Sequence, residues 1–240
     1  MRFRRDGLKR TIAVAFSFAC LGVLASTAQQ PGSKAVIEQV DAAVMARNSG
    51  IAAYQVTEHY AVYRGKDESH PAAEMTVRTT YRKDSGKSYA IVSESGSEFI
   101  RKHVLYTILD HEKEINQPGN REHSWIISAN YAMNLKPGVQ RLDGRDCLVL
   151  AISPRSKGPN MIEGTLSVDA KDGSIVRLEG IASQSPSVFT GPAQVMRQYV
   201  KMDGFAMATH AKAVSDSFLL GRTAIKIDYS DYQIELRQAN

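Results

Sequence analysis

The chain has 240 residues, a formal net charge of +5 and a pI near 9.1. Residues 1–28 hold five of the 30 Lys and Arg side chains and one of the 25 Asp and Glu side chains. Residues 29–240 therefore have 25 basic and 24 acidic side chains, a net charge of +1. Because this remainder has no basic run interleaved with aromatic residues, the sequence argues against nucleic-acid binding.

Residues 1–28 have the pattern of a signal peptide. A basic region from Arg2 to Arg10 precedes the apolar run Thr11–Leu24, and Ser26-Thr27-Ala28 fits a small-x-small cleavage site. The apolar run is shorter than the roughly 20 residues that span a bilayer. We therefore expect export to the periplasm and a single mature domain, residues 29–240. An uncleaved membrane anchor is the alternative, and the choice between general secretory and twin-arginine export stays open.

The first elements of the mature chain are predicted to be one helix and three strands. Residues 34–47 have an apolar stripe at helical spacing, with Ser33 as a candidate cap. Apolar and polar residues then alternate in 54–62 and 75–82, which is typical of strands with one buried face. Asp84-Ser85-Gly86-Lys87 predicts a turn into a third strand, 88–93.

A second helix is expected next, and then a long series of strands. Ser95 and Glu98 match a capping box, and the apolar stripe that follows runs from Phe99 to Leu109. From Trp125 onward, turn signals separate short apolar runs, and each Asp-Gly pair suits a two-residue hairpin. The predicted strands of this part are 147–152, 165–168, 175–181, 195–202, 205–214 and 223–229.

The stretch VDAKDGSIVRLEG, residues 168–180, raises the question of a metal loop or an acid/base site. A calcium loop needs oxygen ligands at alternate positions, and Lys171 occupies one of them. Asp169 and Asp172 instead flank a turn between two apolar runs. The sequence therefore predicts a hairpin here, not a metal or acid/base site.

Other motifs give no catalytic signature, and we expect a protein that is not an enzyme, with no cofactor and no metal. Cys147 is the one cysteine after the signal segment and lies in an apolar strand, so it is interpreted as a small hydrophobe. No His-Glu-x-x-His or Gly-x-Ser-x-Gly motif is present. A hydrolase whose residues converge only in the folded chain remains an alternative, with His103, His111, His123 or His210 beside carboxylates.

Large aromatic and Met side chains occupy one-sided strand positions. They are candidates for the lining of an apolar cavity or for the filling of a solid core, and periodicity alone favours the solid core. These candidate ligand-binding residues are Tyr54, Tyr60, Met75, Tyr81, Tyr89, Met196 and Met202.

Several runs of the chain resemble the LolA-like family, which includes periplasmic lipoprotein carriers and RseB-like sensor proteins. The runs are Leu142-Asp143-Gly144-Arg145-Asp146-Cys147-Leu148-Val149-Leu150, Ser153-Pro154-Arg155, Gly164-Thr165-Leu166-Ser167-Val168-Asp169, Ile175-Val176-Arg177-Leu178-Glu179-Gly180 and Gly221-Arg222-Thr223-Ala224-Ile225-Lys226-Ile227-Asp228-Tyr229. The resemblance covers most of residues 34–236. It implies an α+β fold in which a curved antiparallel sheet forms an unclosed half-barrel with amphipathic helices on its concave face.

The same resemblance implies non-catalytic binding or carriage of a lipid or acylated protein ligand, as in outer-membrane lipoprotein sorting. An RseB-like sensor or interaction module with an envelope protein partner is the alternative. A monomer is expected. The lipoprotein carrier has a strand arginine that controls its lid, and Arg64 and Arg78 are two candidates for that position.

Overall fold

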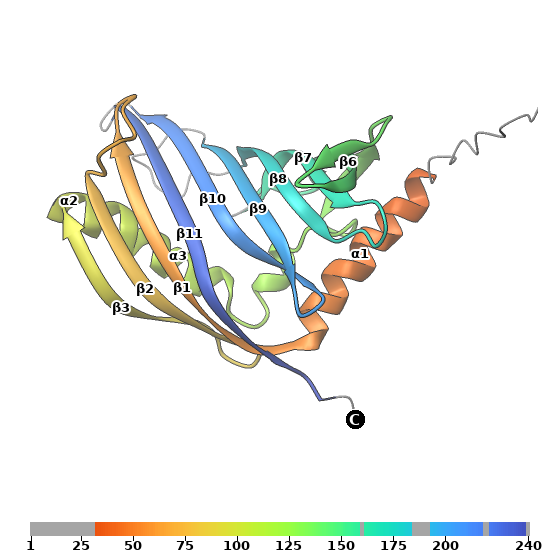
Figure 1. Cartoon of the computed structure of the whole chain (residues 1–240), viewed down its shortest axis with the longest axis horizontal. Helices are drawn as coiled ribbons and strands as arrows, with labels where there is room; N and C mark the ends of the chain where they lie inside the picture. The colour runs from red at the N-terminus through yellow and green to blue at the C-terminus, as the bar shows by residue number, and fades with distance from the viewer. Residues whose placement is uncertain (1–31, 159–160, 184–192, 218–220, 239–240) are drawn as a thin grey trace, which may run out of the picture. The chain divides into compact units, whose positions relative to one another are not determined.

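The computed structural model describes residues 32–158, 161–183, 193–217 and 221–238 (Figure 1). The predicted signal peptide, residues 1–28, lies outside them. The helical elements are α1 (Ser33–Gly50), α2 (Glu98–Ile100), η1 (Arg101–Leu105), α3 (Tyr106–Ile115) and η2 (Arg121–Ser124). The strands are β1 (Ile51–Arg64), β2 (Ala73–Arg82), β3 (Gly86–Gly96), β4 (Tyr131–Leu135), β5 (Gln140–Leu142), β6 (Arg145–Pro154), β7 (Ile162–Asp169), β8 (Ile175–Ala182), β9 (Gln194–Met202), β10 (Phe205–Ser217) and β11 (Gly221–Leu236).

All the described strands join one antiparallel sheet, in the order β3-β2-β1-β11-β10-β9-β8-β7-β6-β4, with β5 beside β6. Strands β3 and β4 are the two ends of that order, so the sheet is not closed (Figure 1). Most neighbours along the chain pair with each other, but β4 pairs with β6, and β1 pairs with β11, so that the first and last strands lie side by side. This pairing joins the N-terminal three-stranded part to the later strands and confirms the predicted α+β unclosed half-barrel.

Helices cover the concave face of the sheet at two places, each over its own apolar cluster (Figure 1). The first cluster packs Val36 and Val40 of α1 against β4, β6, β7 and β8. The second packs Ile100, Val104 and Leu109 against β1 and β2. The buried surface of each helix stripe drives this packing, at about 25 cal/mol per Å² of apolar area. No helix among the described residues is long and apolar enough to span a membrane.

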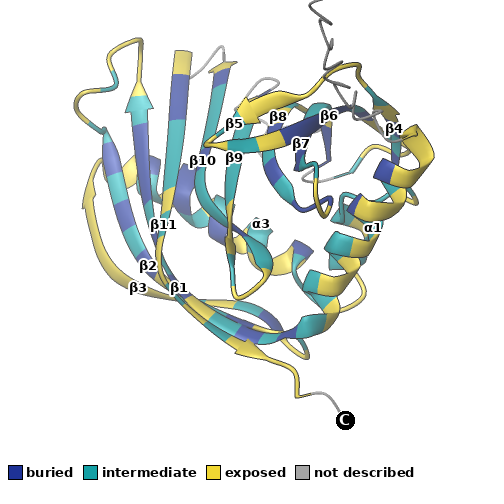
Figure 2. Ribbon diagram, turned by 45° about the vertical axis from the view of Figure 1, so that its right-hand side comes forward, coloured by how far each residue is buried: buried dark blue, intermediate teal, exposed yellow. Residues whose placement is uncertain are grey.

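Period-two alternation sets which side chains face the helices, as the banding of β1 and β2 in Figure 2 shows. In β2, Met75, Val77 and Tyr81 are buried, whereas Arg78 and Arg82 are exposed on the other face. Successive side chains of a strand point to opposite faces of its sheet. The alternation that predicted the strand therefore also predicts its inward face.

The second helix departs from the sequence prediction in two ways. Its N-cap is Ser97, whose side chain accepts a hydrogen bond from the Ile100 N–H; the predicted Ser95 cap is wrong. Ser95 pairs with Glu74 as part of β3, which continues to Gly96. A π-helical turn, η1, also interrupts the helix between α2 and α3. Such turns are set by packing and are invisible in the hydrophobic period.

The Asp-Gly turns follow the expectation at two sites and depart from it at a third. Asp143-Gly144 and Asp203-Gly204 each have positive φ at both residues and connect strands directly, as a two-residue hairpin requires. Between β7 and β8, Asp172 does not have positive φ, and the connection spans residues 170–174. The prediction of a two-residue hairpin there is wrong, although the prediction of a turn is confirmed.

The longer turn is held by its own carboxylates. Asp169 Oδ1 accepts the Lys171 N–H at 2.9 Å, and Asp172 Oδ1 accepts the Ser174 N–H at 3.0 Å. The Gly173 N–H donates to the Asp169 carbonyl at 2.9 Å. These two carboxylates therefore accept hydrogen bonds from the backbone of the turn. Gly173 of the turn packs against Gln39 of α1.

Candidate functional site

Two cavities lie between the concave face of the sheet and the helices. The larger, about 380 Å³, lies between the sheet, the C-terminal half of α1 and the segment 115–126. The smaller, about 160 Å³, lies between α3 and strands β7 to β11 with β1. We name them the polar cavity and the apolar cavity after their linings. The apolar one is lined chiefly by Ile108, Ile162, Val195, Ala211, Ala213, Ile225 and Ile227.

Five side chains line both cavities and form the boundary between them. Register explains how three of the strands bring them together: Glu58 of β1 lies opposite Tyr229 of β11, and Arg197 of β9 projects from the same face two strands away. The edge strand β3 and helix α3 supply the other two. The boundary residues are Glu58, Lys87, Glu112, Arg197 and Tyr229.

Glu58 is a carboxylate at a core position, with 2% of its surface exposed. The Tyr60 hydroxyl donates to its Oε2 at 2.5 Å. Burial and the nearby Glu58 charge raise the pKa of Tyr60 well above its ordinary value, so this hydroxyl stays a donor. A buried carboxylate without partners is costly. The hydrogen bond from Tyr60 therefore provides a partner for this buried carboxyl group.

Lys87 is one of the two cations of the boundary. Its Nζ donates to Glu112 Oε2 at 2.9 Å, which joins β3 to α3 across the concave face. Burial alone disfavours the charged amine, but Glu112 outweighs it and raises the pKa of Lys87 well above its ordinary value. Lys87 therefore remains protonated, and an ion pair crosses the cavity region where an apolar core would place methyl groups.

Arg197 adds a second cation to the boundary. Its burial opposes the charge, but the Tyr199 side chain, Glu112 and Tyr229 together hold its pKa above the ordinary value. For Tyr229, burial disfavours the charged phenolate and so raises the pKa, and the Glu58 charge raises it further. The Tyr229 hydroxyl stays protonated beside the guanidinium, so the boundary offers cations and neutral hydroxyl groups together.

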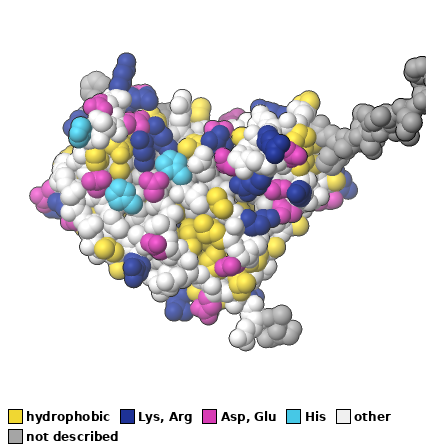
Figure 3. Space-filling model, viewed as in Figure 1, with side chains coloured by type: hydrophobic (Ala, Val, Ile, Leu, Met, Phe, Trp, Pro, Cys, Tyr) yellow, Lys and Arg dark blue, Asp and Glu magenta, His cyan; other side chains and the backbone are white. Residues whose placement is uncertain are grey.

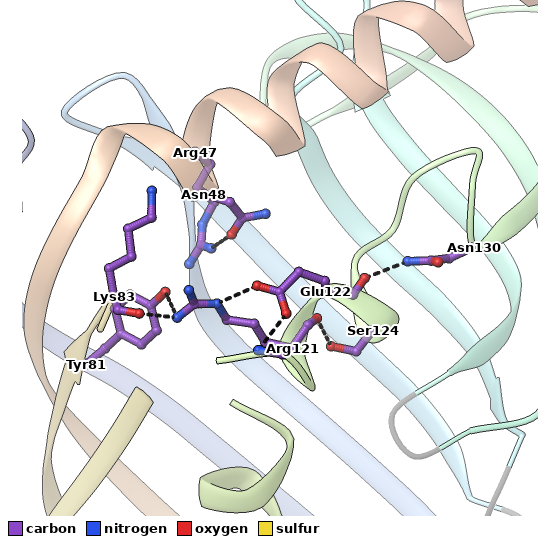
Figure 4. A network of polar contacts seen from close by, with 9 residues as sticks. Arg47, Asn48, Tyr81, Lys83, Arg121, Glu122, Ser124 and Asn130 are labelled. Atoms are coloured by element: carbon purple, nitrogen blue, oxygen red, sulfur yellow. Dashed lines mark hydrogen bonds and ion pairs between the residues drawn. The ribbon is translucent and has the colours of Figure 1, made fainter. Parts of the chain in front are cut away.

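Aromatic rings and arginines line the polar cavity nearest to α1 (Figure 4). The rings of Tyr54 and Tyr81 stack with centroids 4.9 Å apart, and Tyr232 tilts against Tyr54. Arg121 of η2 contacts Tyr81, and its Nη1 donates a hydrogen bond to the Tyr81 hydroxyl at 3.1 Å. Arg47 comes from α1 and lies above Arg121 in the view of Figure 4.

The seven predicted ligand-binding residues fall into three groups. Tyr54 and Tyr81 line the polar cavity, and Tyr60 lines the apolar one. Met75 is 1% exposed in the apolar cluster under α2 and α3, and Tyr89 packs against that cluster. Met196 and Met202 of β9 line neither cavity. The structure thus brings three of the seven together around the cavities.

Sequence reasoning missed the charged boundary, although strand parity contains part of the signal. Glu58 shares the face of Tyr54 and Tyr60 by simple alternation. In β9, one face has Val195, Arg197 and Tyr199. The other face also has apolar side chains, Met196 and Met202, so the sequence does not show which face points inward. Arg64 and Arg78, the candidates for a strand arginine, are both exposed.

Histidines and metals bear on the alternative of a hydrolase. Among the described residues, two histidine–carboxylate contacts occur, at 3.4 Å between His59 Nε2 and Glu74 Oε1 and at 2.6 Å between His210 Nδ1 and Asp228 Oδ1. None of these four residues lines either cavity, but His111, another of the candidate histidines, lines the apolar cavity. Histidines also lie beside acidic side chains on the surface shown in Figure 3. In the described part of the chain, no group of three or more His, Cys, Asp and Glu side chains could hold a metal.

Cys147 has the surroundings of a structural residue. Its side chain is fully buried in β6, and burial raises the pKa of its thiol above the ordinary value. A raised pKa disfavours the thiolate, which is the reactive form. This position agrees with the interpretation of Cys147 as a small hydrophobe.

The fold and its interior define an α+β half-barrel that encloses a two-part cavity under helices. No family model matches the chain, and no curated protein matches it. Among solved structures, it is similar to a LolA superfamily protein from Nitrosomonas europaea, with TM-score 0.46, 11% identity and coverage of 88% of this chain and 96% of the other.

Two further solved structures are similar to the chain over nearly their whole length. A domain assigned to outer membrane lipoprotein-sorting proteins, from Vibrio parahaemolyticus, has TM-score 0.48 and 11% identity, with 85% of this chain and 94% of that one covered. A DUF1329 family protein from Desulfovibrio piger has TM-score 0.43 and 14% identity, with 86% and 94% covered. The likeness to each of these structures is one of fold alone.

Proposed function

We propose that this chain, after export to the periplasm, binds and carries an amphiphilic ligand with an acyl chain. The observation that carries the proposal is the pairing of an apolar cavity with a polar one across a shared boundary. An acyl chain needs a lining without unsatisfied polar groups, which Ala211, Ala213 and Ile227 provide. Its polar end needs donors and charges, which the boundary and the polar cavity provide.

The two cavities have the combined size of a small-molecule site. Together they are within the range of ordinary small-molecule sites, which run from about 300 to 1,000 Å³. Carriage of a lipid or of an acylated protein would place the acyl chain in the apolar cavity and leave the rest of the ligand toward α1. A role in lipoprotein sorting is the particular form of this proposal that the sequence resemblance implies.

The direct test is native mass spectrometry of residues 29–240 purified from a periplasm without detergent, followed by lipid extraction. We expect a stoichiometric acyl-chain adduct. A mass of the protein alone, unchanged after incubation with phospholipids and acylated peptides, contradicts the proposal and favours an interaction module with an envelope protein partner.

A substitution that fills the apolar cavity tests whether the acyl chain binds there. Ala213→Phe places a ring among Val195 and Ile225, its neighbours across β9 and β11. We expect the adduct to be lost, because the ring occupies the space of the acyl chain. The matched control is Ala90→Phe on the exposed part of β3, which should retain the adduct. Retention of the adduct by both variants places the chain elsewhere.

A further inference from the structure

The basic side chains of the polar cavity outnumber its acidic ones. Its lining has five basic and three acidic residues. Three of the basic residues form ion pairs, which are Lys87–Glu112, Lys201–Asp172 and Arg121–Glu122. None of the ion pairs among the described residues includes Arg47 or Arg197. Glu58 is the remaining carboxylate of the lining, so two basic side chains and one acidic side chain of the lining lie outside the ion pairs.

Arg47 and Arg121 approach the Tyr81 ring from two elements (Figure 4). Arg121 is fixed by its Nη1 bonds to the Tyr81 hydroxyl and to the Lys83 carbonyl at 2.6 Å, and by its Nε bond to Glu122 at 3.1 Å. Both guanidinium charges act on the Tyr81 hydroxyl: burial raises its pKa, and Arg121 and then Arg47 oppose that rise. The two cations therefore lie near one phenol group.

Arg47 is held by two hydrogen bonds. Its Nε donates to the Ala206 carbonyl at 3.0 Å, and its Nη1 to Asn48 Oδ1 at 3.3 Å. An arginine has five N–H donors. Among the described residues, no hydrogen bond uses the Nη2 of Arg47 or of Arg121. Each side chain is thus oriented by protein contacts while two of its donors remain available in the cavity.

Like charges near one another in a partly buried space repel, and an anion between them offsets this repulsion. A fixed pair of guanidinium forks is the arrangement that binds carboxylate and phosphate groups with directed hydrogen bonds. The stacked Tyr54 and Tyr81 rings provide an apolar wall beside it. We infer that Arg47 and Arg121 form an anion site beside Tyr81 that receives the carboxylate or phosphate head group of the amphiphile. This inference rests on the proposed function, whose acyl chain lies in the apolar cavity.

The test compares ligands that share one chain and differ in the head group. Isothermal titration of residues 29–240, stripped of lipid, would use laurate, dodecyl phosphate, dodecanol and dodecylamine, each below its micelle concentration, and inorganic phosphate. We expect laurate and dodecyl phosphate to bind at least tenfold more tightly than dodecanol, and dodecylamine to bind most weakly. A hydrogen bond to a charged group is strong enough for about a tenfold difference.

Two charge-matched variants assign the effect to the site. Arg47→Gln should weaken laurate binding about tenfold and leave dodecanol binding unchanged. The control is Arg82→Gln, which removes one positive charge from the exposed face of the sheet one residue after Tyr81. It should leave both ligands unchanged. Circular dichroism of each variant verifies that the fold is retained.

The outcomes separate this inference from the proposed function. Equal binding of laurate, dodecanol and dodecylamine contradicts the anion site and leaves the acyl-chain proposal in place. Failure of every amphiphile to bind overturns the proposed function itself. Binding of inorganic phosphate that laurate does not displace shows a site for a free anion and overturns the assignment to an amphiphile head group.

Discussion

Outside the cavities, the fold stabilises the charged form of Glu68 through two lysine side chains. Glu68 precedes β2, and its carboxylate accepts hydrogen bonds from Lys212 of β10 at 2.8 Å and from Lys226 of β11 at 2.9 Å. Those two hydrogen bonds lower its pKa to about 2. A loop between β1 and β2 is thereby tied to two strands that lie far along the chain.

This contact predicts a pH dependence of stability. Because the folded pKa of Glu68 is lower than its unfolded pKa near 4.5, the contact stabilises the fold above pH 4.5. The contribution is lost as the pH falls through about 2. For a partly exposed network we expect Glu68→Gln to lower the free energy of unfolding by about 1 kcal/mol at pH 7 and by much less near pH 2.5.

Urea unfolding of both proteins at the two pH values measures this difference. Glu38→Gln is the control, because Glu38 forms an exposed i,i+4 pair with Lys34 and should change the free energy of unfolding by less than about 0.5 kcal/mol. A deficit of Glu68→Gln that is the same at both pH values contradicts the assignment to ionisation of Glu68.

At this scale the sequence predicts the inward face of a strand better than it predicts the site. Tyr54, Tyr60 and Tyr81 follow from alternation. Arg197 does not, because β9 has apolar side chains on both of its faces, and only its pairing with β8 and β10 selects the face that meets α3. Lys87 and Glu112 meet across 25 residues of sequence. No local pattern encodes that contact.

At the scale of elements, the turn between β7 and β8 connects the sheet to α1. Gly173 has φ of +70°, and a Cβ built on it would lie 2.6 Å from the backbone carbon of Gln39. The turn therefore needs glycine twice, once for its backbone conformation and once for the close approach of the helix.

Two Asp-Gly turns separate these effects. Gly204 has φ of +86°, with no atom within 4 Å of a built Cβ. We expect Gly204→Ala to lower the free energy of unfolding by about 1 kcal/mol, the cost of a left-handed residue. Gly173→Ala should cost about 3 kcal/mol, because α1 must also shift. Chemical denaturation checks both values, and equal losses would show that the helix accommodates the methyl group without strain.

Most elements follow from the sequence, and the exceptions have physical causes. Helix α1 and strands β6 to β10 are predicted to within a few residues, since each has a local period, whereas β11 extends to Leu236, well beyond its predicted end, and β4 and β5 have no predicted counterpart. The π-helical turn η1 and the true cap Ser97 depend on how the helix packs on β2 and where β3 ends. The pairing of β1 with β11 is a contact between the two ends of the domain, and no turn signal announces it.

At the scale of the whole domain, binding of a ligand in the cavities would be coupled to the folding equilibrium. Their linings come from α1, α3, both halves of the sheet and the segment between α3 and β4. An unfolded chain has no such lining. A ligand that binds the folded domain alone therefore adds a free energy that grows with the ratio of its concentration to its Kd, about 2.7 kcal/mol at a hundredfold excess over Kd.

This linkage predicts a ligand-dependent melting temperature. For a domain of about 200 residues, 2.7 kcal/mol corresponds to a rise in Tm of roughly 5–10 °C. Calorimetry of residues 29–240 with laurate should show that rise in the lipid-free protein and in Ala90→Phe, and almost none in Ala213→Phe. Since laurate held on the outer surface would stabilise all three proteins equally, an equal shift places the ligand outside the half-barrel. A shift confined to the proteins with an open apolar cavity identifies the space beneath α3 as the place where the acyl chain binds.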